Sequence, residues 1–130
     1  MDLHLPDPVY FDDQHRLFRD SVRRFVQNEV EPHIAAWEDA GHTPRAVLRA
    51  MGELGLLGIR YPETYGGAAL DTVYSAILAE ELGRSTCGGF AVTVLVHTDM
   101  ASPHLARFGT PAQLERYLPA VVRGDCLTAV

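Results

Sequence analysis

The stretch "TPAQLERYLPAVVRGDCLTAV", residues 110–130, contains the most clearly defined helix of the sequence, followed by a short segment with strand character. Thr110 and Gln113 match a capping box, and Pro111 occupies the first helical position. Gly124 is suited to end the helix. The apolar residues between these ends recur at spacings of three and four, which predicts one buried helical face: Leu114, Tyr117, Leu118, Val121 and Val122.

The last five residues, 126–130, have the composition of the start of a β-strand. A single strand would leave its backbone donors and acceptors unpaired. We therefore expect the pairing partners of this segment to lie in polypeptide outside the sequence, either in another chain or in a continuation of this one.

The first third of the sequence predicts a long, interrupted helix. Residues 12–30 place apolar side chains at helical spacing behind an acidic start. Pro32 lacks the N–H that a helix interior needs, so we expect a kink or a one-turn break there. Helical composition continues beyond the proline, and Gly41 is the expected stop.

Two further helices are indicated by their end signals. Thr43 is the expected N-cap of one, with a proline at the first helical position and Gly55 past the end. Asp71 is the expected N-cap of the other, and Gly83 its expected C-cap. Glycine and proline are frequent in residues 58–69, which predicts a loop between the two helices.

Residues 87–109 have two interpretations. Valine and threonine dominate residues 90–96, which favours a strand. Small and apolar residues continue to Phe108 with only Pro103 as a break, which favours a helix buried on most of its faces. The pattern alone leaves both open. The other elements predict an all-α fold, an orthogonal or up-down bundle of about five to six helices, with the start of a strand at the C-terminus.

Composition narrows the classes of partner. The chain of 130 residues is 47% apolar and 22% charged, which is typical of a soluble globular domain. Its net charge of -6, without a basic run, argues against nucleic acid. The longest apolar run is too short to span a membrane, and the N-terminus lacks an export signal, so we expect a cytoplasmic protein. The two cysteines, Cys87 and Cys126, are expected to be reduced thiols.

Three stretches resemble the N-terminal α-helical domain of the acyl-CoA dehydrogenases, in that family's order and spacing. They are "LGLLGIRYPETYGG" (54–67), "AEELGR" (79–84) and "FGTPAQLERYLPAVVRGD" (108–125). The resemblance implies that residues 1–125 form this helical domain and that residues 126–130 begin a β-domain. It also implies that the ambiguous segment is a helix lining the acyl pocket.

The resemblance also implies a reaction. The family removes the α-proton of an acyl thioester while the β-hydrogen leaves as hydride to FAD, and electrons pass to an electron-transfer flavoprotein. The base is a glutamate in the C-terminal bundle of most members, so no catalytic residue and no activity are expected of this chain alone. FAD is expected to be bound mainly by other regions, and the complete protein to be a dimer or tetramer. Glu80 and Glu81 are adjacent on a helix and point apart, so we expect a solvated face or a domain contact.

By resemblance, Thr93, Val96, His97 and Met100 lie on the face of a helix that meets the acyl chain. Ordinary core packing is the alternative for each of them. The polar ring of His97 suggests either a polar or ring-bearing acyl group, or a slightly rotated helix. Val130 reaches the edge of the family's flavin segment and is expected to touch the cofactor through its backbone.

Other functions are compatible with the same features. The chain could be a stand-alone helical binding module, the helical part of a split enzyme, or part of a relative that uses a carrier-protein thioester or acts as a flavin monooxygenase. A metal site at His97 and His104 is not expected, because ligand pairs on a helix are usually three or four residues apart. The "RGD" string at residues 123–125 is expected to be a helix end rather than an adhesion motif.

Overall fold

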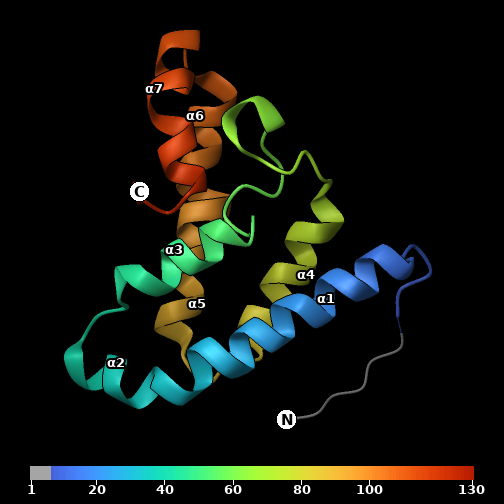
Figure 1. Ribbon diagram of the computed structural model, residues 1–130, viewed down its shortest axis with the longest axis vertical. Coiled ribbons are helices and arrows are strands. Elements are labelled where there is room, and N and C mark those ends of the chain that lie inside the picture. Colours follow the sequence, from blue (N-terminus) through green and yellow to red (C-terminus); the bar gives the residue numbers. More distant parts are fainter. Residues whose placement is uncertain (1–6) are drawn as a thin grey trace.

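The computed structural model describes residues 7–130, and within that range all regular secondary structure is helical (Figure 1). The all-α prediction is therefore confirmed. The α-helices are α1 (Asp13–Phe25), α2 (Ile34–Ala40), α3 (Arg45–Glu53), α4 (Thr72–Gly83), α5 (Gly88–Leu95), α6 (Ser102–Phe108) and α7 (Pro111–Val122). The shorter elements are η1 (Val26–Val30), η2 (Glu31–His33), η3 (Glu63–Tyr65) and η4 (Val96–Ala101).

Two long helices are interrupted by π-helical turns. The first runs through α1, the π-helix η1, the 3₁₀ turn η2 and α2, with Pro32 in η2. The second runs through α5, the π-helix η4 and α6, with Pro103 in the first turn of α6. The predicted break at Pro32 and the helical interpretation of residues 87–109 are confirmed, whereas the strand interpretation of residues 90–96 is wrong.

Local capping explains most helix starts. The Asp71 carboxylate accepts a hydrogen bond from the Val73 N–H at 2.9 Å, and Thr110 forms the predicted capping box with Gln113. The expected N-cap at Thr43 is wrong by one residue, because Pro44 is still extended, with ψ of 142°. The helix α4 includes Gly83 and is capped by Arg84, because Gly83 does not adopt the left-handed conformation.

The expected strand is also absent. Residues 126–130 contain no regular secondary structure in the structure. The physical reason is the one that made the strand unusual in the sequence: its backbone groups have no neighbouring strand to pair with.

The core has two parts, which α5, η4 and α6 connect. The larger cluster lies among α1, α3, α4 and α5, and the smaller one contains Tyr61 and the buried face of α7. Figure 1 shows α5 and α6 following one another along the long axis, with α5 nearer the first long helix and α6 beside α7. The element η4 thus lies where the two clusters meet.

Glycine permits a close contact between α3 and the end of α7. A Cβ at Gly52 would lie 2.3 Å from the Arg123 carbonyl oxygen. Gly124 has φ of +76°, and a Cβ there would lie 2.7 Å from the Leu48 carbonyl oxygen. Only glycine fits the backbone at these two positions. The structure therefore accounts for the glycine of the "RGD" string as a helix-end residue.

Candidate functional site

The segment formed by α5 and η4 has one buried and one exposed face. Phe90, Val94, His97 and Ala101 are buried, and they point toward the core. Val92 and Met100 are 59% and 51% exposed, and Thr93 and Val96 are half-buried. We call Val92, Thr93, Val96 and Met100 the outer stripe. Three of the four predicted pocket residues therefore belong to the exposed side of the helix.

Val92 was missed by the sequence interpretation, although it lies four residues before Val96 and eight before Met100. That spacing places Val92 on the same side of the helix as the other two residues. The four-residue spacing was therefore the signal in the sequence that could have identified it. Together, these three residues give the exposed side of the helix an apolar surface.

Thr93 lies at the edge of the outer stripe. Its hydroxyl donates a hydrogen bond to the Gly89 carbonyl at 2.8 Å, so the hydroxyl is used within the helix. The side chain also lines a cavity of about 220 Å³ between the end of α2 and the start of α5, which Trp37 and His42 share. Thr93 is therefore accessible from the side of α2 rather than buried in the core.

His97 lies on the opposite side of the helix from the outer stripe. It is 1% exposed, and both ring nitrogens have partners in the chain. Nε2 lies 3.1 Å from the carbonyl oxygen of Val121, and Nδ1 lies 3.0 Å from the backbone nitrogen of Thr128. Burial lowers the pKa of His97 below its ordinary value, against a smaller opposing effect of the bond to Val121. The ring is therefore neutral at pH 7.

The C-terminal segment, residues 126–130, lies beside η4. The Thr128 hydroxyl is 3.2 Å from the His97 carbonyl oxygen, in addition to the contact between the Thr128 backbone and the ring. Val130, two residues further on, is 81% exposed. The fold thus places Thr128, two residues before the predicted cofactor contact, against the predicted pocket helix, although 31 positions separate His97 from Thr128 in sequence.

A second polar contact supports the same turn. The Ser102 hydroxyl is fully buried and bonds to the His97 carbonyl oxygen, and the Tyr61 hydroxyl bonds to Ser102. Burial raises the pKa of Tyr61, which keeps its hydroxyl protonated. The sequence interpretation missed both residues. A serine next to a proline in an apolar segment was the only signal.

Among the described residues, Glu81 has a buried carboxylate, so it does not lie on a solvated face. Glu81 is 1% exposed, and the Arg23 guanidinium holds it by two bonds, Nη2 to Oε1 at 2.8 Å and Nε to Oε2 at 3.0 Å. The expectation of a solvated face is correct for Glu80 and wrong for Glu81, because α1 supplies a compensating charge. With both oxygens bound to a cation, Glu81 is not placed to act as a base.

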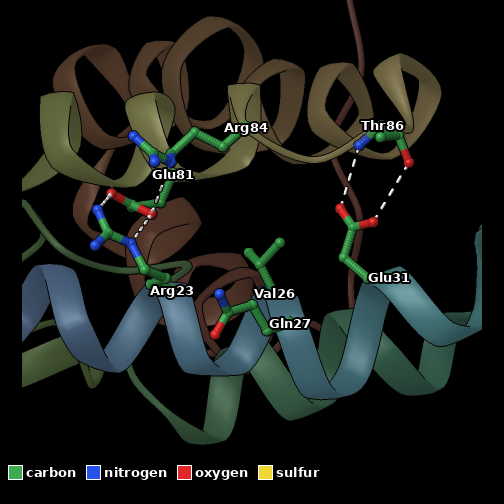
Figure 2. Close-up of a pocket in the computed structure, with 7 residues that line it drawn as sticks. All are labelled: Arg23, Val26, Gln27, Glu31, Glu81, Arg84 and Thr86. Carbon is green, nitrogen blue, oxygen red and sulfur yellow. Dashed lines mark hydrogen bonds and ion pairs between the residues drawn. The ribbon is translucent and has the colours of Figure 1, made fainter. Parts of the chain in front are cut away.

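This ion pair lies at one end of a groove of about 370 Å³ between the first long helix and the end of α4 (Figure 2). At the other end, Glu31 accepts hydrogen bonds from the backbone and the hydroxyl of Thr86, at 3.2 and 3.4 Å. Figure 2 shows Val26 and Gln27 between these two contacts. The Arg23–Glu81 pair and the Glu31–Thr86 hydrogen bonds join the first long helix to α4 and to the turn that follows α4.

The described residues contain no group of three His, Cys, Asp or Glu side chains arranged to hold a metal ion. His97 is buried, whereas His104 is exposed and donates from Nδ1 to the Met100 carbonyl at 2.7 Å. Among the helices within residues 7–130, none combines the length and hydropathy that a bilayer-spanning segment needs.

Comparisons with known proteins agree on one family. Residues 12–125 match the family model described as acyl-CoA dehydrogenase, N-terminal domain. The chain is 39% identical over 120 residues to the mitochondrial long-chain specific acyl-CoA dehydrogenase of Mus musculus, covering 92% of this chain and 27% of that protein. The chain thus spans about a quarter of the length of this relative.

Solved structures show the same fold. An acyl-CoA dehydrogenase from Geobacillus kaustophilus superposes with a TM-score of 0.86 and 34% identity, over 93% of this chain and 31% of that one. An acyl-CoA dehydrogenase from Bacillus anthracis, solved in complex with FAD, gives 0.83 and 34%, over 95% and 21%. This chain therefore belongs to the acyl-CoA dehydrogenase family, and residues 12–125 form its N-terminal helical domain.

Proposed function

We propose that the complete protein is an FAD-dependent acyl-CoA dehydrogenase and that this chain supplies one wall of the slot that holds the acyl chain beside the flavin. The observation that carries the proposal is the outer stripe. Val92 and Met100 remain more than half exposed on a helix whose other face is fully buried, so an apolar surface is left for another group to cover.

The outer stripe is suited to sort acyl chains by size. Each methylene moved from water to an apolar wall contributes about 0.8 kcal/mol, so side-chain bulk at Val96 and Met100 affects which chain length fits. His97 has a different role from these residues. The orientation of the helix, rather than a polar acyl group, accounts for its polar ring, because the ring points into the protein.

The proton acceptor of the proposed reaction belongs to other polypeptide. Removal of a weakly acidic α-proton needs a carboxylate that is shielded from water and free to accept it. Among the described residues, Glu81 has the buried carboxylate, and this carboxylate forms an ion pair with the Arg23 guanidinium. It is therefore not free to accept a proton. This chain's contribution is to bind the acyl group and to exclude water from one side.

FAD, when bound, supplies the hydride acceptor. The exposed Val130 fits a contact at the edge of the cofactor, since the segment before it is fixed through Thr128. A single exposed residue can contact the edge of the cofactor but cannot form its binding site. We therefore assign most of the FAD site to other regions. The purified 130-residue chain should accordingly lose FAD on gel filtration. Co-elution of one FAD per chain would contradict this assignment.

Several finer features are part of the same proposal. We assign acyl-CoA as the thioester and fatty acid metabolism as the context, because the relative from Mus musculus is named for long-chain acyl-CoA. Electron-transfer flavoprotein as the acceptor, a dimer or tetramer and a cytoplasmic location come from the sequence interpretation. Since that relative is named mitochondrial, cell fractionation is the experiment for location.

Substitution of Met100 tests the pocket wall in the complete enzyme. Met100→Ala shortens an exposed apolar side chain without the backbone cost of glycine, and we expect kcat/KM to shift toward longer acyl-CoA substrates. About one methylene of extra room corresponds to a roughly fourfold change in the ratio between adjacent chain lengths. Phe108→Ala, an exposed residue at the end of α6 outside the outer stripe, is the matched control.

An unchanged chain-length profile in Met100→Ala would remove the pocket wall from the proposal. Activity with carrier-protein thioesters instead of acyl-CoA, or oxygen consumption with hydroxylated product, would replace the dehydrogenase by one of its variants.

A further inference from the structure

We propose that His97 is a positioning residue that clamps the C-terminal segment, residues 126–130, to η4 and so fixes where the chain leaves the helical domain. The imidazole lies between two parts of the chain that are distant from it in sequence. One contact is the Val121 carbonyl in the last turn of α7, and the other is the backbone N–H of Thr128.

The two contacts define one state of the ring. A carbonyl only accepts, so Nε2 must carry the proton that it donates to Val121. A backbone N–H only donates, so Nδ1 must be unprotonated to accept from Thr128. The neutral tautomer with its proton on Nε2 therefore satisfies both partners. In the other tautomer, Nδ1–H would face the Thr128 N–H, and the lone pair of Nε2 would face the Val121 carbonyl oxygen.

The backbone of His97 makes the second half of the clamp. In the π-helical turn η4 its carbonyl oxygen accepts from the N–H of Ser102, the residue after the turn. The same oxygen is bonded by the Ser102 hydroxyl and lies 3.2 Å from the Thr128 hydroxyl. Tyr61 holds Ser102 from the loop between α3 and α4. The ring and the carbonyl of one residue thus hold the backbone and the side chain of Thr128.

Apolar contacts attach the same segment but do not orient its backbone. Leu127 packs against the larger core cluster and Cys126 against the smaller one. Such contacts are not directional. The hydrogen bonds from His97 add direction, because they fix which way the Thr128 amide faces.

The consequence for function rests on the proposed function above. The turn that carries Val96 and Met100 on its exposed side carries His97 on its buried side. The clamp therefore ties the position of Val130, the proposed cofactor contact, to the acyl wall. A change in the ring would move the exit of the chain relative to the outer stripe.

Nitrogen-15 NMR of the imidazoles and amide hydrogen exchange test the clamp in the purified protein at pH 7, without a variant. We expect the His97 ring to be neutral with its proton on Nε2, and the Thr128 amide to be protected. A proton on Nδ1, or a Thr128 amide that exchanges at the rate of an unstructured peptide, overturns the proposal.

Three variants separate a clamp from simple packing. His97→Ala removes both ring contacts, and we expect the Thr128 amide to exchange roughly two- to tenfold faster relative to core amides of α1. His97→Gln keeps one donor and one acceptor and should restore part of the protection. His104→Ala removes the exposed histidine of α6 and should leave Thr128 unchanged. Equal loss in His97→Gln and His97→Ala, or loss in His104→Ala, would contradict the assignment.

These readouts are independent of catalysis. If His97→Ala does not fold, the ring spectrum and the amide exchange of the unmodified protein decide the question. An intact clamp in a protein without acyl-CoA activity would sustain this inference and contradict the proposed function. A missing clamp in an active dehydrogenase would do the reverse.

Discussion

The two long helices share one backbone device and use it differently. Each passes through a π-helical turn, η1 or η4, shortly before a proline in the next element. The first turn buries Val26 and Val30, which belong to the larger hydrophobic cluster. The second buries His97, and Ser102 follows directly after it, so its interior is polar.

The difference shows what a helix interruption can supply. A π-turn widens the helix locally and changes which carbonyls are available to other partners. At η1, apolar packing surrounds the turn, and its role is to redirect the chain from α1 into α2. At η4, the Ser102 hydroxyl and Thr128 bond to His97, and the Tyr61 hydroxyl bonds to Ser102, so the turn also joins three parts of the chain.

Removing the polar group at the second turn should have the largest effect on stability. His97→Leu leaves the Thr128 N–H without its partner, which costs about 1–3 kcal/mol for a buried group. It also removes the hydrogen bond to the Val121 carbonyl, worth about 1 kcal/mol because that carbonyl keeps its bond from the Gly124 N–H. We expect a loss of about 2–4 kcal/mol in the free energy of unfolding, measured by denaturant titration. His104→Leu, at an exposed position, should change it by less than about 0.5 kcal/mol. A His97→Leu protein as stable as the unmodified one would contradict a structural role for the polar contacts.

The apolar first turn should respond only through the loss of buried apolar contacts. Val30→Ala removes two methyl groups from a fully buried site, which predicts a loss of about 2 kcal/mol from transfer and cavity effects. Amide exchange at Thr128, measured relative to core amides, should stay as it is. Faster exchange at Thr128 in Val30→Ala would show that the two turns are coupled, contrary to the comparison.

Acid should distinguish the two turns as well. Burial lowers the pKa of His97 below 6.5 in the folded state, so the unfolded chain binds a proton more readily. The contribution of the neutral ring to stability is complete above pH 6.5 and decreases as the pH falls below that value. Each pKa unit corresponds to about 1.4 kcal/mol.

Denaturant titrations between about pH 7 and pH 5 measure this dependence, a range that spans the ordinary histidine pKa. The slope should be smaller in His97→Gln and unchanged in Val30→Ala. Parallel curves for the unmodified protein and His97→Gln would show that His97 does not titrate differently in the two states.

The prolines should matter least. Pro32 and Pro103 occupy the first or second position of η2 and α6, where a backbone N–H needs no partner within the element. Replacing either by alanine mainly adds freedom to the unfolded chain and should cost about 0.4–1 kcal/mol. Thermal unfolding of Pro32→Ala and Pro103→Ala measures this. A loss above about 2 kcal/mol in one of them would mean that its proline maintains the neighbouring π-turn.

Sequence reasoning succeeded where the signal is local. The capping box at Thr110, the N-cap at Asp71 and the break at Pro32 depend on side chains within four residues, and all three were predicted. The errors at Thr43 and Gly83 are shifts of one residue, in line with the usual uncertainty of helix boundaries. The helical nature of residues 90–96 needed the family resemblance, because composition favoured a strand.

The candidate site was predictable only in part. The spacing of Val96 and Met100 placed them on one side of a helix, and the structure leaves that side exposed. Spacing alone did not show that His97 faces the other way, because its partners, Val121 and Thr128, are 24 and 31 residues distant. The burial of Glu81 was missed for the same reason, since Arg23 lies 58 residues away.

The sequence by itself determined the helices, most of their ends, the family and the apolar character of the outer stripe, since these depend on neighbouring residues and on the order of motifs. Tertiary structure alone decided which polar side chains are buried and what they bind. A buried charge or ring is tolerated only where a partner meets it, and the fold brings that partner from elsewhere in the chain.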